Sequence, residues 1–307
     1  MAQKRSAKKN YPDLHGIVLL NKPKGISSNL ALQKIRHLFK AKKAGHTGNL
    51  DPMATGLLPC CFGDATKVAH LLINSDKTYV ARCVLGSQTD TGDATGEVVE
   101  TADITQLTDE QVLSACDALT GDIEQVPPMY SALHHNGRRL YELAREGKVV
   151  DRPARKATIH QFKLLDNTAT HIDFEIKVSK GTYIRTLLED FAKACGTVAH
   201  MSALHRTQTG IFSGEDMLTL EAFTESDNLS SHLINMDQAL IEYPKQRLSA
   251  EQTRDLIHGK TITCDGDADM YRLFDQNDCF LGMGDLNQGG TLRVKKLFLK
   301  SYQGIDI

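Results

Sequence analysis

The chain has 307 residues, 36 Lys+Arg against 38 Asp+Glu, and no tryptophan. This length favours one large domain plus a smaller one, and no apolar run approaches the roughly 20 residues of a membrane helix. The net charge of −2 is uneven, because residues 214–307 carry 9 basic and 16 acidic side chains and leave 27 and 22 to the rest, so the larger part can bind an acidic partner such as nucleic acid.

The seven cysteines are odd in number and form no CxxC pair. They indicate reduced, mostly buried thiols in a cytoplasmic protein, not a disulfide framework or a zinc site. The basic start, residues 1–12, predicts a disordered arm. No long apolar segment follows it, so we do not expect a secretory signal.

The first regular elements are a strand and a helix. Residues 16–25, GIVLLNKPKG, predict a buried strand that ends in a Pro/Gly turn. Residues 27–45 predict a helix, because apolar residues recur at three- and four-residue spacing from Leu32 to Phe39. Ser28 is the expected N-cap.

Residues 45–56, GHTGNLDPMATG, surround one carboxylate, Asp51, with residues that shape the backbone. Pro52 biases Asp51 toward an extended conformation, and the three glycines permit close approach of a ligand. Two interpretations remain open: Asp51 simply starts a turn, or a rigid loop presents it as a nucleophile or base. No GK[ST] closes a P-loop here, and Met53 stands where an aspartate phosphatase would carry a second Asp.

The next segment alternates and then turns. Residues 77–88 predict a strand with Tyr79 on its buried face. Residues 89–96, TDTGDATG, predict a solvated turn without the ligand pattern of a calcium loop. Thr108 and Gln111 have the spacing of a capping box at the start of a helix.

Residues 138–156 carry seven basic and three acidic side chains. Asn136-Gly137 predicts a tight turn before them, and Gly147 ends a short helical stripe. A solvated charged face and a flexible arm that grips phosphates both fit this pattern.

Residues 171–196 predict a strand, a glycine turn and a helix that starts near Arg185. A cation at a helix start is unfavourable for the helix dipole. Arg185 therefore pairs with a buried carboxylate, either at a functional site or in a structural ion pair. After residue 247, short strands between Asp/Gly turns predict a small, acidic, β-rich domain.

Five motifs resemble, in the same order, those of TruB-type tRNA pseudouridine synthases: GHTGNLDPMATGLLP, KTYVARCVLGSQTDTGD, QVPPMYSALHHNGRRLYELAREG, SKGTYIRTLLED and AHMSALHRTQTGIF. The resemblance covers about residues 15–213. It implies an α+β fold: a catalytic domain with a mixed sheet over 13–246, a thumb arm inserted at about 127–155, and, from a looser match, a PUA-like RNA-binding domain at 247–307.

The resemblance also implies a reaction. The uridine in the TΨC loop of tRNA, at tRNA position 55, is turned out of its stack and isomerised to pseudouridine. The isomerisation is redox-neutral, so we expect no cofactor and no metal. The expected partner is tRNA, and we expect a monomer without an obligate protein partner.

The resemblance assigns roles to residues of this chain. Asp51 is the catalytic aspartate, with attack on C1′, attack on C6 and deprotonation of C2′ all open, and Arg185 orients it and lowers its pKa. Tyr79 is the active-site aromatic, and His46 fills the space that the flipped base leaves. The other expected substrate-binding residues are Leu204, Tyr183 and Lys22, the last also a support of the loop; the expected RNA-binding residues are Lys42, Lys43, Arg138, Arg139, Arg145, Arg152 and Arg155.

Two departures from the family pattern stand out. Asn49 replaces a usual threonine, and we expect activity to survive because asparagine also suits turns. His134-His135 replaces a pair that usually contains lysine, which makes RNA binding more sensitive to pH. Three alternatives are a snoRNA-guided or mRNA-acting synthase, a non-catalytic RNA-binding module or chaperone, and an aspartate-based hydrolase.

Overall fold

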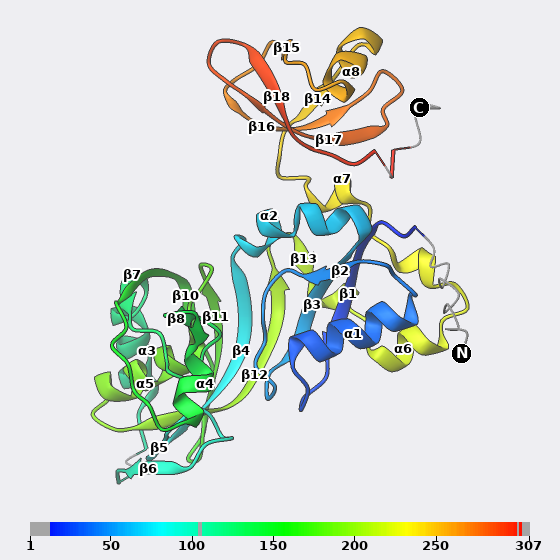
Figure 1. Cartoon of the computed structure of the whole chain (residues 1–307). Coiled ribbons are helices and arrows are strands. Elements are labelled where there is room, and N and C mark those ends of the chain that lie inside the picture. Colours follow the sequence, from blue (N-terminus) through cyan, green and yellow to red (C-terminus); the bar gives the residue numbers. More distant parts are fainter. Residues whose placement is uncertain (1–12, 104–105, 300, 303–307) are drawn as a thin grey trace.

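The computed structural model describes residues 13–103, 106–299 and 301–302, so the arm expected at 1–12 lies outside the described residues. Two sheets dominate it, one of nine strands and one of five (Figure 1). The strands of the nine-stranded sheet lie within residues 16–213, and the five-stranded sheet forms from the C-terminal part. Between them runs the short helix α7 (Met236–Ala239).

The large sheet has the strand order β1-β3-β12-β4-β11-β10-β7. Neighbouring strands are antiparallel except β3 and β12, which are parallel. The sheet is therefore mixed, as predicted. Its strands are β1 (Gly16–Lys22), β3 (Thr55–Phe62), β12 (Ala199–Thr209), β4 (Lys77–Leu85), β11 (Ile172–Val178), β10 (Arg155–Asn167) and β7 (Gly121–Gln125), with β2 (Ala44–His46) on β3 and β13 (Phe212–Ser213) on β12.

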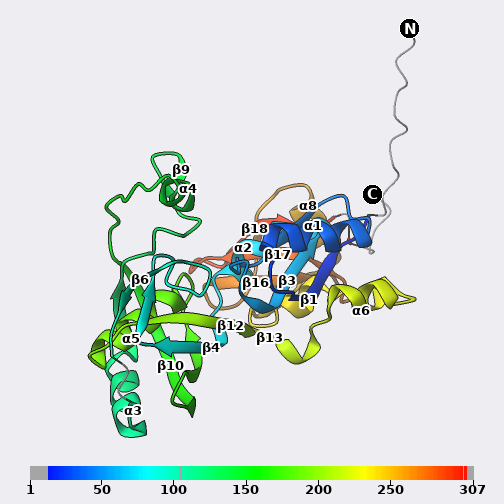
Figure 2. The same cartoon turned by 90° about the horizontal axis from the view of Figure 1, so that it is seen from below.

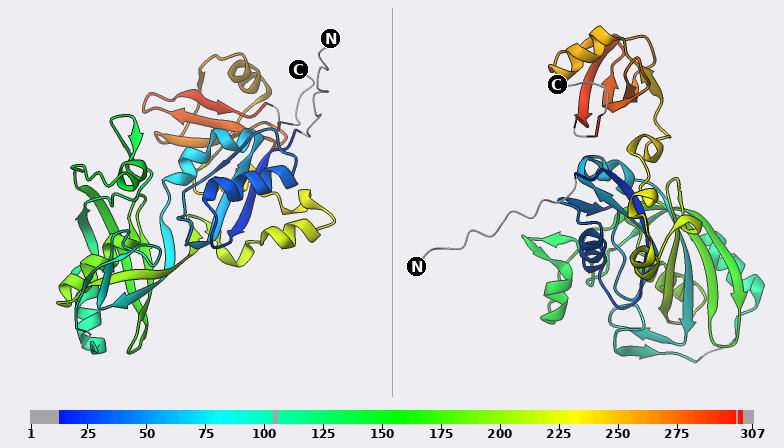
Figure 3. Two further views of the ribbon diagram at one scale, coloured as in Figure 1. Left: turned by 60° about the horizontal axis from the view of Figure 1, so that its bottom comes forward. Right: turned by 90° about the vertical axis from the view of Figure 1, so that its right-hand side faces the viewer.

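Two pairs of helices cover the two halves of this sheet (Figure 3). Helices α1 (Ser28–Leu38) and α6 (Leu220–Glu225) pack beside β1 and β3. Helices α3 (Asp109–Ala118) and α5 (Ile184–Ala194) pack on the other half, where three phenylalanine rings meet. Within the described parts of the chain, no helix is both long and apolar enough to cross a membrane.

The helix starts follow local capping chemistry. The capping box of Thr108 and Gln111 forms at α3, as predicted. At α1 the predicted N-cap is wrong by one residue: Ser27 accepts the hydrogen bond from Leu30 N, and Ser28 is the first helical residue. Ser28 is instead buried, and its hydroxyl donates to the backbone carbonyl of Leu50. Leu50 lies in residues 45–56, which we call the Asp51 loop.

The arm between β7 and β10 projects from the body of the protein (Figure 2). It carries β8 (His134–His135), β9 (Arg138–Arg139) and α4 (Leu140–Arg145). Asn136 and Gly137 join the two strands with φ angles of 50° and 82°, which is the tight turn that their sequence predicts. We call residues 127–155 the thumb arm.

The C-terminal sheet packs onto the large sheet through a shared apolar core. Met283 and Phe298 belong to one cluster with Val68 and Met236, and Lys67 donates to the carbonyl of Leu297 at 3.0 Å. The strands of this sheet are β14 (Lys245–Arg247), β15 (Ile262–Thr263), β16 (Asp269–Phe274), β17 (Phe280–Leu286) and β18 (Thr291–Leu297), with helix α8 (Ala250–Ile257) beside them.

Short elements complete the connections. The segment after Phe62 is divided into a 3₁₀ turn, η1, and the short helix α2, because Val68 has non-helical angles between them. The bounds are η1 (Gly63–Lys67), α2 (Ala69–Ile73), β5 (Ser87–Thr89), β6 (Val98–Thr101), η2 (Gly214–Asp216) and η3 (Leu229–His232).

Candidate functional site

A cleft of about 550 Å³ opens where the Asp51 loop, the start of α5, strands β4 and β12 and the base of the thumb arm converge. The lining residues Gly48 and Arg206 are 158 residues apart in the sequence, and the sheet order brings their segments together. Six of the residues predicted from sequence line this cleft: Asp51, Tyr79, Arg155, Tyr183, Arg185 and Leu204.

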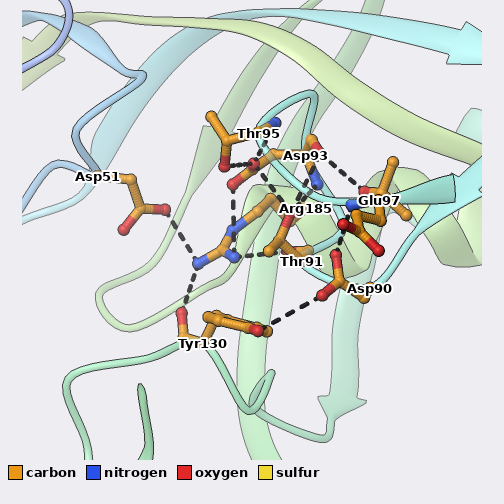
Figure 4. Close-up of polar contacts among 9 residues, drawn as sticks. Asp51, Asp90, Thr91, Asp93, Thr95, Glu97, Tyr130 and Arg185 are labelled. Atoms are coloured by element: carbon orange, nitrogen blue, oxygen red, sulfur yellow. Dashed lines mark hydrogen bonds and ion pairs between the residues drawn. The ribbon is translucent and has the colours of Figure 1, made fainter. Parts of the chain in front are cut away.

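The centre of the cleft is an ion pair. Arg185 Nη2 lies 3.0 Å from Asp51 Oδ2 (Figure 4). The Arg185 side chain is 5% exposed, whereas that of Asp51 is 35% exposed. The guanidinium is thus fixed in the protein, while the carboxylate keeps an open side toward a ligand.

Arg185 is held by three further groups. It donates to the carbonyls of Thr91 and Tyr130 at 2.6 and 2.7 Å, and Asp93 Oδ2 lies 3.6 Å away. Asp93 is buried and accepts hydrogen bonds from Thr91 and Thr95 (Figure 4). The prediction of a solvated turn at 89–96 is therefore wrong, because the carboxylate of Asp93 balances a buried guanidinium.

The pKa of Asp51 lies above its ordinary value. Burial in the cleft is the main cause, because it disfavours the charged form, and the neighbouring Asp93 adds to it. Arg185 and Lys22 act in the opposite direction, as their charges favour the carboxylate. Arg185 thus lowers this pKa, as predicted, but burial outweighs the ion pair and the net shift is upward.

Buried polar groups support the Asp51 loop from below. Ser28 accepts from Leu50 N at 2.7 Å and donates to Leu50 O at 2.9 Å. Lys22 is fully buried, and its ammonium donates to the carbonyls of Ile26 at 2.7 Å and of Pro52, in the Asp51 loop, at 3.5 Å. Burial lowers the pKa of Lys22 to about 8. Lys22 thus supports the loop and does not line the cleft.

The walls of the cleft are largely apolar. Tyr79 on β4 is 9% exposed and Leu204 on β12 is 8% exposed. Tyr183 precedes α5, and its backbone N–H and C=O bond the side chain of Gln125 at 2.8 and 3.1 Å. A planar, uncharged group the size of a nucleobase suits such walls.

The other predicted residues lie outside the cleft lining. His46 ends β2, and its Nδ1 accepts from Gly48 N at 3.4 Å; burial, helped by Arg206, lowers its pKa. Lys42 and Lys43 are exposed before β2. The thumb arginines not yet placed divide in exposure: Arg138 and Arg145 are exposed, and Arg139 and Arg152 are half-buried.

One group of possible metal ligands exists among the described residues. Ligand atoms of Asp166, His171 and Asp173 lie within 4.8 Å of one another at the β10–β11 hairpin. None of the three lines the cleft, and Asp173 already accepts hydrogen bonds from Nε and Nη2 of Arg82. The expectation that the reaction uses no metal stays a prediction.

Nearly all of residues 36–298 match one protein family. Residues 36–184 match the description "TruB family pseudouridylate synthase (N terminal domain)", 185–241 "tRNA pseudouridylate synthase B C-terminal domain" and 244–298 "Pseudouridine synthase II TruB, C-terminal". The "tRNA pseudouridine synthase B" of Hydrogenovibrio crunogenus is 45% identical over 95% of this chain and 96% of the relative. The chain belongs to the TruB family. It is a pseudouridine synthase, an enzyme that isomerises uridine to pseudouridine.

Another relative and two solved structures are similar to this TruB-family chain. The "tRNA pseudouridine synthase B" of Nitrosococcus oceani is 44% identical over 93% of this chain and 95% of its own. "Structure of H/ACA RNP bound to a substrate RNA containing 2'-deoxyuridine" and "Crystal Structure of a Cbf5-Nop10-Gar1 Complex" both give a TM-score of 0.71, cover 92% of this chain and 84% of theirs, and are 21% and 24% identical. The two structures confirm the predicted fold class.

Sequence reasoning missed four polar residues of this TruB-family site. Asp93 balances Arg185, and Arg206 lies under the Asp51 loop. Lys77 and Lys180 line the cleft; burial lowers the pKa of Lys77 to about 8. Asp93 and Arg206 lie inside quoted motifs, TDTGD and ALHRTQTG, so the motifs marked them, but only their burial distinguishes them from surface residues.

Proposed function

We propose that the protein converts the uridine at position 55, in the TΨC loop of tRNA, into pseudouridine. The support for tRNA as the substrate is that relatives named tRNA pseudouridine synthase B align with this chain over nearly its full length. The observation that carries the proposal is the 3.0 Å pair of Asp51 and Arg185 at the centre of the cleft. A half-open carboxylate with a fixed orientation is what each route to pseudouridine requires.

The residues of the cleft divide the reaction between them. The N1–C1′ bond of the uridine breaks, C5 bonds to C1′, the C5 proton leaves and N1 takes up a proton, so that the product is an isomer of the substrate. Asp51 acts as the ionised group, by attack on C1′, attack on C6 or removal of the C2′ proton. Tyr79 stacks on the flipped uracil, and its phenol can exchange a proton with C5. Leu204 and Tyr183 exclude water from the base.

The target uridine can enter the cleft only after it leaves the base stack of the RNA. We assign His46 to the space that the base leaves, because its lowered pKa keeps the imidazole neutral and suited to stacking at neutral pH. The thumb arm lies at the mouth of the cleft, to which Ser131 and Leu133 contribute. Its arginines, together with Lys42 and Lys43, are proposed to contact phosphates.

The proposal also covers the domain organisation, the oligomeric state and the cellular location of the protein. The catalytic unit is residues 13–246, and residues 247–307 form a PUA-like unit that adds RNA contacts. The protein acts as a monomer, in the cytoplasm, and without an obligate partner.

The test is an in vitro modification assay. An unmodified tRNA transcript is incubated with the protein in EDTA, and pseudouridine is mapped along the RNA. Product at the TΨC-loop uridine is expected, and a transcript with cytidine at that position is the matched control. The absence of pseudouridine at this position would overturn the proposal. Pseudouridine at another position only would show that the protein acts on a different uridine.

A further inference from the structure

Arg206, on β12, is among the largest fully buried side chains of the described chain, at 1% exposure. Its guanidinium donates only to backbone carbonyls: Nε to Leu57 at 2.7 Å, Nη2 to Gly48 at 3.3 Å and Nη1 to Asn49 at 3.4 Å. Among the residues that the structure describes, no carboxylate oxygen lies within 4.0 Å of it. The charge is thus buried without a direct counterion.

These contacts join the two ends of the Asp51 loop. Gly48 and Asn49 precede Asp51, and Leu57 follows it on β3. Gly56 lies directly opposite Arg206 in the parallel pairing of β3 and β12. It has a φ of +99°, and a Cβ there would lie 2.4 Å from the carbonyl oxygen of Arg206. The loop therefore closes around Arg206, and its glycines allow that approach.

A purely structural anchor would not need a charge at this place. Burying an ion without an opposite charge costs several kcal/mol, and Arg206 adds to that cost by lowering the pKa of its neighbours Lys22 and Lys77. What the guanidinium offers is a planar fork of donors that reaches three carbonyls in different directions. Such a fork fixes the backbone path of the residues just before Asp51.

The anchored backbone leads directly to the reacting group. Asp51 follows Asn49 by two residues, and Ser28 fixes the intervening Leu50. Arg185 is immobile in its own buried network, so the ion pair forms only if the loop delivers the carboxylate to it. His46, on the other side of Gly48, is placed by the same backbone.

We propose that Arg206 is a positioning residue of pseudouridine formation, which holds the carbonyls of Gly48 and Asn49 so that Asp51 meets Arg185. This inference rests on the proposed function. Arg206 borders the cleft, but its guanidinium bonds the backbone carbonyls of the loop, so it acts through the loop. A displacement of about 1 Å at a reacting group can cost about 100-fold in rate.

The test compares Arg206→Lys and Arg206→Met with the wild type in single-turnover assays on the tRNA transcript, below the melting temperature of each variant. RNA affinity is measured separately by filter binding. We expect Arg206→Met to lose about 100-fold in rate at saturating RNA with an affinity within about threefold of wild type. Arg206→Lys keeps the charge without the fork, so it should recover only part of that rate.

Arg82→Met is the matched control, because Arg82 is an exposed arginine on β4 that pairs with Asp173 on β11. It should retain the wild-type rate. If both Arg206→Lys and Arg206→Met fold and both react within threefold of the wild-type rate, the inference is overturned. Failure of both variants to fold would also overturn it, since Arg206 would then serve the fold. If the wild type itself forms no pseudouridine, the proposed function has failed instead.

Discussion

At the scale of single residues, the site depends on where charges are buried. Arg185 is surrounded by Asp51, Asp93 and two carbonyls, so it has no freedom to follow a moving partner. Asp51 keeps one side open and has a raised pKa. The site therefore holds a carboxylate that is less stable in its ionised form than one in water, which makes it more reactive as a base or nucleophile.

Asp51→Asn separates chemistry from binding. The amide cannot act as a carboxylate, so turnover should be lost, whereas RNA affinity should change little. Because the folded pKa of Asp51 lies above the unfolded one, its ionisation costs folding stability at pH values above both. The variant should thus melt no lower than the wild type at pH 7 in a thermal scan. Wild-type turnover would remove Asp51 from the chemical step.

The pH profile tests the raised pKa directly. The single-turnover rate at subsaturating RNA, which reports the RNA-free protein, should fall on acidification, with a midpoint above the value of about 4 for an ordinary aspartate, because protonated Asp51 is inactive. Asp173→Asn is the control: the pKa of Asp173 is lowered by Arg82, and its loss should leave the profile unchanged. A midpoint at or below 4 would show that Arg185 outweighs burial.

At the scale of elements, the thumb arm holds itself together with its own charges. Arg138 pairs with Glu146, which also pairs with Lys148 at 2.9 Å. These bonds lower the pKa of Glu146 to about 2, but all three side chains are exposed and the pairs contribute little to stability. RNA phosphates can therefore replace Glu146 as the partner of these cations at little cost.

Substitution of alanine for Arg138, Arg139 and Arg152 removes three positive charges. It should weaken RNA binding and flatten its salt dependence. Each lost phosphate contact reduces the slope of log K against log salt by about 0.7–0.9, so a change of about 2 is expected. RNA binding is measured at several salt concentrations between about 50 and 200 mM. The control removes Arg82, Lys163 and Lys193, three exposed cations of β4, β10 and α5 that lie outside the thumb arm and the C-terminal unit. Equal slopes for the two triple variants would leave the arm a solvated face.

At the scale of the whole molecule, the C-terminal sheet is part of one cooperative structure. The cluster that contains Met283 and Phe298 continues into β1, β3 and α2 of the large sheet. Arg272 on β16 also donates to the carbonyls of Asp237 and Tyr243 at 3.0 and 2.8 Å. The C-terminal sheet therefore cannot move freely without exposing apolar surface.

Calorimetry should show a single unfolding transition. Phe298→Ala, in the shared core, should lower the stability of the whole chain by about 3–5 kcal/mol. Leu273→Ala, in the core of the C-terminal sheet itself, should shift the same transition. Two transitions, of which only one moves, would show that the two sheets unfold independently.

Much of the fold follows from local sequence. The capping box at Thr108, the turn at Asn136-Gly137 and the alternating strand around Tyr79 depend on residues that are neighbours in the chain. The five motifs and their resemblance to a family also predicted six of the residues that line the cleft. The N-cap of α1 was misplaced because Ser27 and Ser28 are equally good caps, and only a tertiary contact to Leu50 distinguishes them.

By itself the sequence determined the family and the mixed α+β class. It also indicated Asp51 as the central carboxylate and Arg185 as its partner. Only the tertiary structure decided that Asp93 is buried, that the pKa of Asp51 is raised, that Arg206 closes the Asp51 loop and that the two sheets share a core. The physical reason is that turns and caps depend on adjacent residues, whereas desolvation and Coulomb interactions depend on which distant segments meet. Arg206 and Gly48 are 158 residues apart, and no local pattern records their contact.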